Sequence, residues 1–161
     1  MTAAVVYYSK TGRTKVMAEL VAQGMRAAGD VDVHLFDVGH IDNAVLSECK
    51  AVVFGTPTYY ANMCWQLKKW FDESWSCKLG GRLGAAFATA DYAQGGADIA
   101  IQAVLGHLMV KGMLVYSGGS SLGQPYIHLG PVALKEQGDS CNNQFVTFGR
   151  RIAEKALELF G

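Results

Sequence analysis

Short apolar runs alternate along the chain with longer stretches in which apolar residues recur at helical spacing. Five apolar runs predict strands, at residues 3–8, 31–36, 51–55, 83–88 and 113–116. The stretches between them repeat with the period of amphipathic helices. The order is βαβαβαβαβα, and such alternation implies a parallel sheet with helices on both faces. We therefore predict an α/β fold, doubly wound around a five-stranded parallel sheet.

The predicted helices cover residues 14–28, 41–48, 64–71, 101–111 and 145–159. Asn62 is the expected N-cap of the third helix, and residues 118–139 are expected to form a long loop. No linker, internal repeat or low-complexity segment divides the chain. Residues 1–161 are therefore expected to form a single domain.

The charge balance narrows the range of partners. Charged residues make up 17% of the chain, against a usual value of about 25%, which favours elements buried on both faces. The 14 Lys and Arg residues balance the 14 Asp and Glu residues, so the net charge is zero. Such a chain has no field that attracts nucleic acid or an anionic membrane. We expect neither partner, and no apolar stretch predicts membrane insertion.

The cysteines and histidines show no spacing typical of a metal site. Cys49, Cys64, Cys77 and Cys141 are far apart in the sequence, whereas metal and Fe–S sites use closely spaced pairs. A chain of this size needs no disulfides to fold, so we expect reduced thiols and a cytoplasmic location. No Ser/His/Asp or Cys/His pairing is visible, so we predict neither a metal site nor a catalytic side chain.

Ligands of such sheets bind beyond the carboxyl ends of the strands, and the first loop there has the chemistry of an anion site. It reads Ser9-Lys10-Thr11-Gly12-Arg13-Thr14 and precedes a helix. Gly12 permits a sharp turn, and the loop N–H groups, the hydroxyls and the helix N-terminus favour an anion. Because the Walker pattern and G-x-G-x-x-G are absent, a monophosphate is favoured over a diphosphate. The alternative is a polar turn in which Thr14 only caps the helix.

The loop after the third strand, Thr56-Pro57-Thr58-Tyr59-Tyr60, combines hydroxyls with flat aromatic side chains. Pro57 is expected to end the strand, because it offers no N–H to a ladder. Such side chains suit a planar, partly polar ring. The alternative is a turn whose tyrosines cover the end of the sheet.

The loop after the fourth strand contains Thr89, Asp91, Tyr92 and Gly95. Its glycines allow the backbone to approach a ring closely, and Tyr92 offers a stacking face. The alternative is a flexible glycine turn, which we prefer for Asp91.

Two of these loops resemble known flavoprotein segments. The pattern S-x-T-G-x-T from Ser9 resembles the FMN-phosphate loop of flavodoxin-like proteins. The pattern G-T-P-T-x-x-x-N-M from Gly55 is similar to a segment of the WrbA-type NAD(P)H:quinone oxidoreductases, a branch of that superfamily. The resemblance implies a flavodoxin-like fold, FMN as cofactor and NAD(P)H as co-substrate. Together with the loop chemistry, it predicts cofactor binding by Ser9, Lys10, Thr11, Gly12, Arg13, Thr14, Thr56, Pro57, Thr58, Tyr59, Tyr60, Asn62, Thr89, Asp91, Tyr92 and Gly95.

Two functions are compatible with this chemistry. The first is an oxidoreductase that passes electrons from NAD(P)H through FMN to a quinone or similar small-molecule acceptor. The alternative is a flavodoxin-type electron carrier reduced by a separate reductase. The resemblance implies strongly acidic carriers, whereas this chain is neutral, so we expect the enzyme. We also expect a homo-oligomer, either a dimer or a tetramer.

Overall fold

The computed structural model describes residues 1–161. Its strands are β1 (Thr2–Tyr7), β2 (Asp32–Asp37), β3 (Ala51–Tyr59), β4 (Asn62–Met63), β5 (Leu83–Ala90), β6 (Leu114–Val115) and β7 (Val132–Leu134). Its α-helices are α1 (Arg13–Ala27), α2 (Asn43–Glu48), α3 (Trp65–Glu73), α4 (Ala97–Val110) and α5 (Asn142–Phe160). Short 3₁₀ turns occur at η1 (Val38–His40), η2 (Ser120–Leu122) and η3 (Lys135–Gln137).

The central sheet has the order β2-β1-β3-β5-β6, and these neighbours are parallel. Strand β4 pairs antiparallel with the end of β3. The order reverses direction beside β1, so the sheet is doubly wound, and the carboxyl ends of β1, β3 and β5 lie next to one another. The predicted α/β fold is confirmed.

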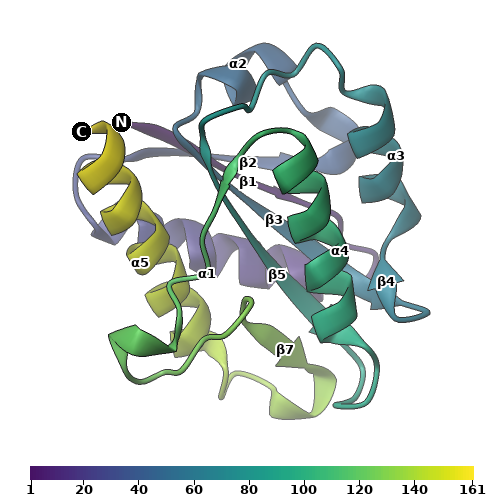
Figure 1. Ribbon diagram of the computed structural model, residues 1–161. Coiled ribbons are helices and arrows are strands. Elements are labelled where there is room, and N and C mark those ends of the chain that lie inside the picture. Colours follow the sequence, from purple (N-terminus) through teal and green to yellow (C-terminus); the bar gives the residue numbers. More distant parts are fainter.

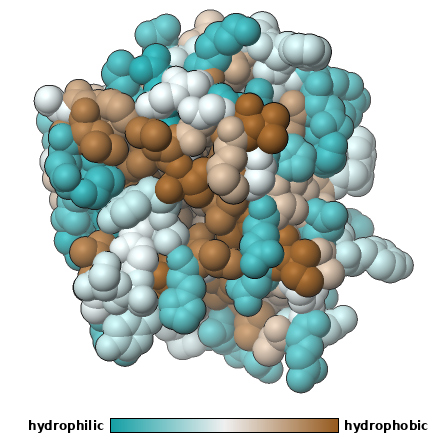
Figure 2. All heavy atoms as spheres, in the orientation of Figure 1, coloured by the Kyte–Doolittle hydropathy of each residue, from teal (hydrophilic) through white to brown (hydrophobic).

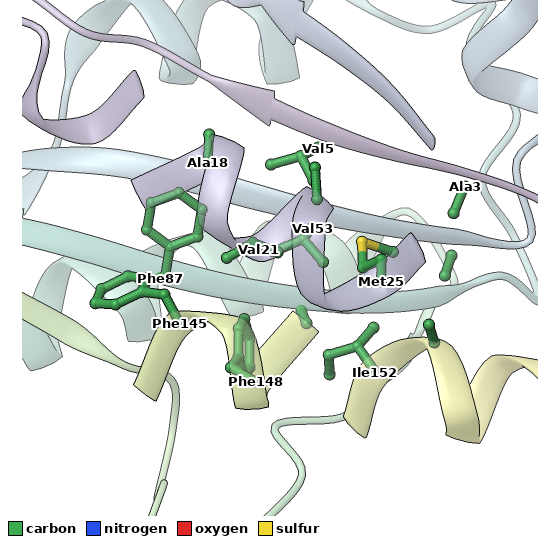
Figure 3. Close-up of a cluster of buried hydrophobic side chains, with 14 of the residues drawn as sticks. Ala3, Val5, Ala18, Val21, Met25, Val53, Phe87, Phe145, Phe148 and Ile152 are labelled. Atoms are coloured by element: carbon green, nitrogen blue, oxygen red, sulfur yellow. The ribbon is translucent and has the colours of Figure 1, made fainter. Parts of the chain in front are cut away.

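Helices cover both faces of this sheet (Figure 1). Residues of α1 and α5 form one buried cluster with the side chains that point to their side of the sheet, and Figure 3 shows Phe87, Phe145 and Phe148 in it. Residues of α2, α3 and α4 form the second cluster on the opposite face. Ala3 and Val5 belong to the first cluster, and Ala4 and Val6 to the second. This alternation explains why the strand is apolar throughout.

The fifth strand departs from the prediction, because it is split in two. Leu114 pairs with Leu83 at the start of β5, and Val132 pairs with Ala88 near its end. The chain leaves the sheet edge between these pairings and then returns. The expected loop at residues 118–139 therefore contains η2, β7 and η3. Strand β7 has only three residues, too few to give a periodic signal.

Strand β3 also runs further than predicted, because Pro57 does not end it. Pro57 pairs with Thr89 of β5, whereas β1 ends with Tyr7 opposite Gly55. Position 57 therefore has a strand neighbour on one side only, and its missing N–H breaks no ladder bond.

The strand then turns back as a hairpin in which Tyr59 pairs with Asn62 of β4. The prediction that Asn62 caps the third helix is wrong. Cys64 occupies the N-cap of α3 without a side-chain cap bond, and Asn62 Oδ1 instead accepts a hydrogen bond from the Met63 N–H at 2.8 Å.

Candidate functional site

A cavity of about 1350 Å³ opens at the carboxyl ends of β1, β3 and β5. It is lined by the three predicted loops together with two residues from the segment after β7. The predicted site residues that line it are Lys10, Thr11, Gly12, Arg13, Thr14, Pro57, Thr58, Tyr59, Tyr60, Thr89, Asp91, Tyr92 and Gly95. Three other predicted residues, Ser9, Thr56 and Asn62, are not in its lining.

The first loop leaves the start of α1 open toward the cavity. Gly12 is the N-cap, with a φ of 97°, and no side chain caps the helix. The first turn contains no acidic residue, so its free N–H groups and the positive end of the helix dipole are available to an anion. A Cβ built on Gly12 would meet nothing within 4 Å. The alternative in which Thr14 caps the helix is wrong.

The hydroxyls of Ser9, Thr11 and Thr14 in this loop differ in their surroundings. Ser9 Oγ accepts a hydrogen bond from the Gly12 N–H at 3.1 Å, so Ser9 shapes the turn. Thr14 is buried, and its Oγ1 lies 2.9 Å from Thr89 Oγ1. That bond joins the loop after β1 to the end of β5 across the sheet. Thr11 is exposed and lines the cavity.

The loop after β3 is fixed from below by Thr56. This side chain is fully buried, donates to the Pro57 carbonyl at 2.7 Å and accepts from the Cys64 N–H at 3.0 Å. Its hydrogen-bonding groups are therefore directed into the protein. Two positions further on, Thr58 Oγ1 is buried at the cavity wall without any hydrogen-bond partner. An unpaired buried hydroxyl costs about 1–3 kcal/mol. Because the residue lines the cavity, rotation of its side chain would let this hydroxyl bond a polar ligand.

The hairpin turn after Tyr59 is strained. Tyr60 and Ala61 have φ values of 49° and 55°, which side chains other than glycine rarely adopt. A two-residue hairpin loop of type I′ needs positive φ at both positions, so the cost is imposed by the turn. Ala61 also lies directly against Gly96, where an added Cβ would come within 2.5 Å of the Ala61 Cβ. The loops after β3 and β5 are therefore in close contact.

Exposed aromatic rings surround the mouth of the cavity. Tyr59 is 40% exposed, Tyr92 63% and Tyr60 106%, so Tyr60 makes almost no contact with the rest of the protein. Burial raises the pKa of Tyr59, and Tyr8, Cys64 and Asp91 raise it further. The Tyr59 phenol is therefore protonated at neutral pH and is able to donate a hydrogen bond.

Several residues that line the cavity were not among the predicted site residues. They are Val16, Ala61, Ala90, Gln94, Lys135 and Asp139. Ala90 and Gln94 adjoin predicted residues, whereas Lys135 and Asp139 are distant in sequence. These two residues reach the cavity because strand β7 pairs with β5 just before them. That strand is too short to be predicted from the sequence.

The site fits a mononucleotide that carries a flat ring. The open start of α1 accepts an anion, the buried Thr58 hydroxyl lacks a polar partner, and the loops that line the cavity carry flat tyrosine side chains. A diphosphate loop is absent. The fold and the site thus define a doubly wound protein of the class that binds flavin mononucleotide.

The comparisons with known proteins agree with this class. The model of the family described as flavodoxin matches residues 5–126. A flavodoxin from Clostridium saccharobutylicum is 46% identical over 160 residues, which span 99% of this chain and 100% of that protein. The chain belongs to the flavodoxin family, and it is an electron-transfer flavoprotein with FMN as its cofactor.

Two further similarities extend to the quinone oxidoreductase branch. An NAD(P)H dehydrogenase (quinone) from Chromohalobacter salexigens is 30% identical over 147 residues, covering 76% of this chain and 70% of that protein. The crystal structure of a flavodoxin, WrbA-like protein from Agrobacterium tumefaciens superposes with a TM-score of 0.78 at 27% identity, over 98% of both chains. The resemblance to both branches is confirmed.

None of the helices combines the length and the apolar character needed to cross a membrane.

Proposed function

We propose that this protein is an electron carrier, which holds FMN in the cavity and is reduced by a separate reductase. The supporting observation is the extent of the similarity. The alignment with the Clostridium saccharobutylicum flavodoxin spans 100% of that protein at 46% identity, whereas the quinone dehydrogenase alignment spans 70% of its partner at 30% identity. The carrier alternative is therefore favoured over the NAD(P)H–quinone enzyme that the neutral charge led us to expect.

The residues of this chain bind and orient the cofactor. The free N–H groups at the start of α1 and the hydroxyl of Thr11 hold the phosphate, and Thr14 Oγ1 donates to it while accepting from Thr89 Oγ1. Thr58 offers its hydroxyl to the polar part of FMN, and Tyr59 and Tyr92 flank the ring. When bound, FMN supplies the redox chemistry, because it accepts and releases one or two electrons.

The second candidate function is the oxidoreductase that takes electrons from NAD(P)H and passes them to a quinone. It is supported by the 30% identity to the quinone dehydrogenase and by the WrbA-like structure. The chain has a net charge of zero, so long-range attraction to a charged protein partner is weak. A small neutral acceptor needs no such attraction.

The two functions are separated by one anaerobic experiment. The protein is loaded with FMN, freed of excess flavin and mixed with NADH or NADPH while the absorbance of the oxidised flavin is followed. A carrier keeps its absorbance until a catalytic amount of an NADPH-dependent flavoprotein reductase is added. Rapid bleaching by NADH or NADPH alone refutes the carrier function, and a quinone is then tested as acceptor.

We further propose that the protein associates with itself through the exposed side of α4. Apolar side chains reach the surface on the face that α4 covers (Figure 2). Met109 and Val110 of α4 are 61% and 89% exposed, and Leu114 of the adjoining strand β6 is 50% exposed. Val110→Glu should convert a dimer into a monomer in light scattering. A wild-type protein with the mass of a monomer would refute the association.

A further inference from the structure

Arg13 lies in the predicted phosphate loop, but its guanidinium is directed to the segment after β7. Its Nη2 donates to the carbonyl oxygens of Leu134 at 3.0 Å and Gly138 at 2.9 Å, and it lies 3.6 Å from Cys141 Sγ. Its Nε is buried without a partner. The donors on Nη2 are therefore committed to holding this segment against the first residue of α1.

The held segment brings two charges to the phosphate end of the cavity. Lys135 follows Leu134 directly, and both Lys135 and Asp139 line the cavity together with residues 10–14. Both side chains are exposed at the rim, and neither forms a salt bridge. Their charges are therefore free to act on an anion at the start of α1.

We propose that Lys135 adds to the preference of this site for FMN over riboflavin, and that Arg13 is the positioning residue that holds Lys135 in place. The proposal rests on FMN binding in the cavity. The ammonium of Lys135 attracts the phosphate dianion, whereas the Asp139 carboxylate repels it. Arg13 acts through the two N–H groups of Nη2 rather than through its charge, because they already bond the carbonyl groups of Leu134 and Gly138.

The test compares FMN with riboflavin, which has the same ring but no phosphate. Affinities of the apoprotein for both flavins are measured by quenching of flavin fluorescence at low ionic strength. Lys135→Met should weaken FMN binding by about threefold to tenfold, and Asp139→Asn should strengthen it by a similar factor. Neither variant should change riboflavin binding, and both effects should shrink at about 0.5 M salt, where charges are screened.

Lys15→Met is the matched control, because Lys15 lies in the first turn of α1 but does not line the cavity. It should leave FMN affinity within about twofold of the wild type. Equal losses for FMN and riboflavin in Lys135→Met would overturn the proposal, and so would an unchanged FMN affinity. Failure of the reductase experiment leaves this binding result intact, so the two proposals fail separately.

The positioning role of Arg13 has its own readout. When Lys135→Met is added to a protein that already carries Arg13→Gln, it should cost little further FMN affinity. Arg13→Gln alone should accelerate hydrogen exchange at residues 134–141. If Lys135→Met still cost its full factor in FMN affinity in the Arg13→Gln background, and hydrogen exchange at residues 134–141 were unchanged there, the positioning role would be refuted.

Discussion

The packing of α1 against α5 depends on two glycines that face the backbone of the opposite helix. A Cβ on Gly149 of α5 would lie 2.0 Å from the Val21 carbonyl oxygen, and one on Gly24 of α1 would lie 1.9 Å from the Val146 carbonyl oxygen. Ordinary contact begins near 3.4 Å, so Gly149→Ala forces the helices apart by roughly 1.4 Å. Overpacking of this kind costs about 3 kcal/mol, and the better helix propensity of alanine returns about 1 kcal/mol.

We therefore expect Gly149→Ala to lower the free energy of unfolding by about 2 kcal/mol, or the melting temperature by about 4–8 °C. Gly106→Ala in α4 is the matched control, because a Cβ there meets nothing within 4 Å. It should raise stability by up to about 1 kcal/mol. Urea unfolding of both apoproteins measures the difference. If the two variants were equally stable, the close approach of α1 and α5 would be refuted.

Three further changes test the site and its surroundings. Thr58→Val removes an unpaired buried hydroxyl, so it should stabilise the apoprotein by about 1 kcal/mol and weaken FMN binding about tenfold. Unchanged FMN affinity in a fluorescence titration would show that the Thr58 hydroxyl does not bond FMN. Burial raises the pKa of the Cys49 thiol from 9.0 to about 11, so folding favours the neutral thiol, and up to about 3 kcal/mol of stability should be lost as pH rises from 9 through 11. Cys49→Ala should flatten this alkaline loss in unfolding experiments, and an unaltered pH profile would exclude Cys49 as its source. Arg151 is 5% exposed and donates to the carbonyl oxygens of residues 122–125 at 3.0–3.2 Å. Arg151→Met should therefore lower the free energy of unfolding by about 2 kcal/mol and speed proteolysis at residues 122–125. Arg150 is exposed, so Arg150→Met should change neither the stability nor the rate of proteolysis.

The strands with buried neighbours on both sides were predictable from sequence. Each of β1, β3 and β5 is a continuous apolar run, because the two faces of the sheet bury alternate side chains. The three loops at their carboxyl ends line the cavity as predicted. Hydroxyl, glycine and aromatic residues are concentrated there, and this local chemistry is visible without the fold.

The missed features all depend on contacts between distant segments. Strand β7 is defined by its pairing with β5, and it carries Lys135 and Asp139 to the cavity. Arg13 was predicted to bind the cofactor from a variable position of the phosphate loop, but the carbonyl groups of that late segment bond its Nη2. Thr56 was predicted to contact the ring, but it faces inward, because the β3–β4 hairpin places the Cys64 N–H beneath it. Periodicity does not encode such partners.

The unfavourable features of this protein collect at one end of the sheet. Thr58 buries an unpaired hydroxyl there, and Tyr60 and Ala61 adopt strained backbone conformations that cost of order 1–3 kcal/mol each. These residues line a single cavity. A ligand that bonds the Thr58 hydroxyl removes the cost of that hydroxyl, whereas the backbone cost at residues 60–61 belongs to the hairpin turn. FMN that satisfies Thr58 and packs against the hairpin therefore stabilises the folded chain by mass action. The stability gained on adding FMN should fall in Thr58→Val, because that variant has no unpaired hydroxyl left to satisfy.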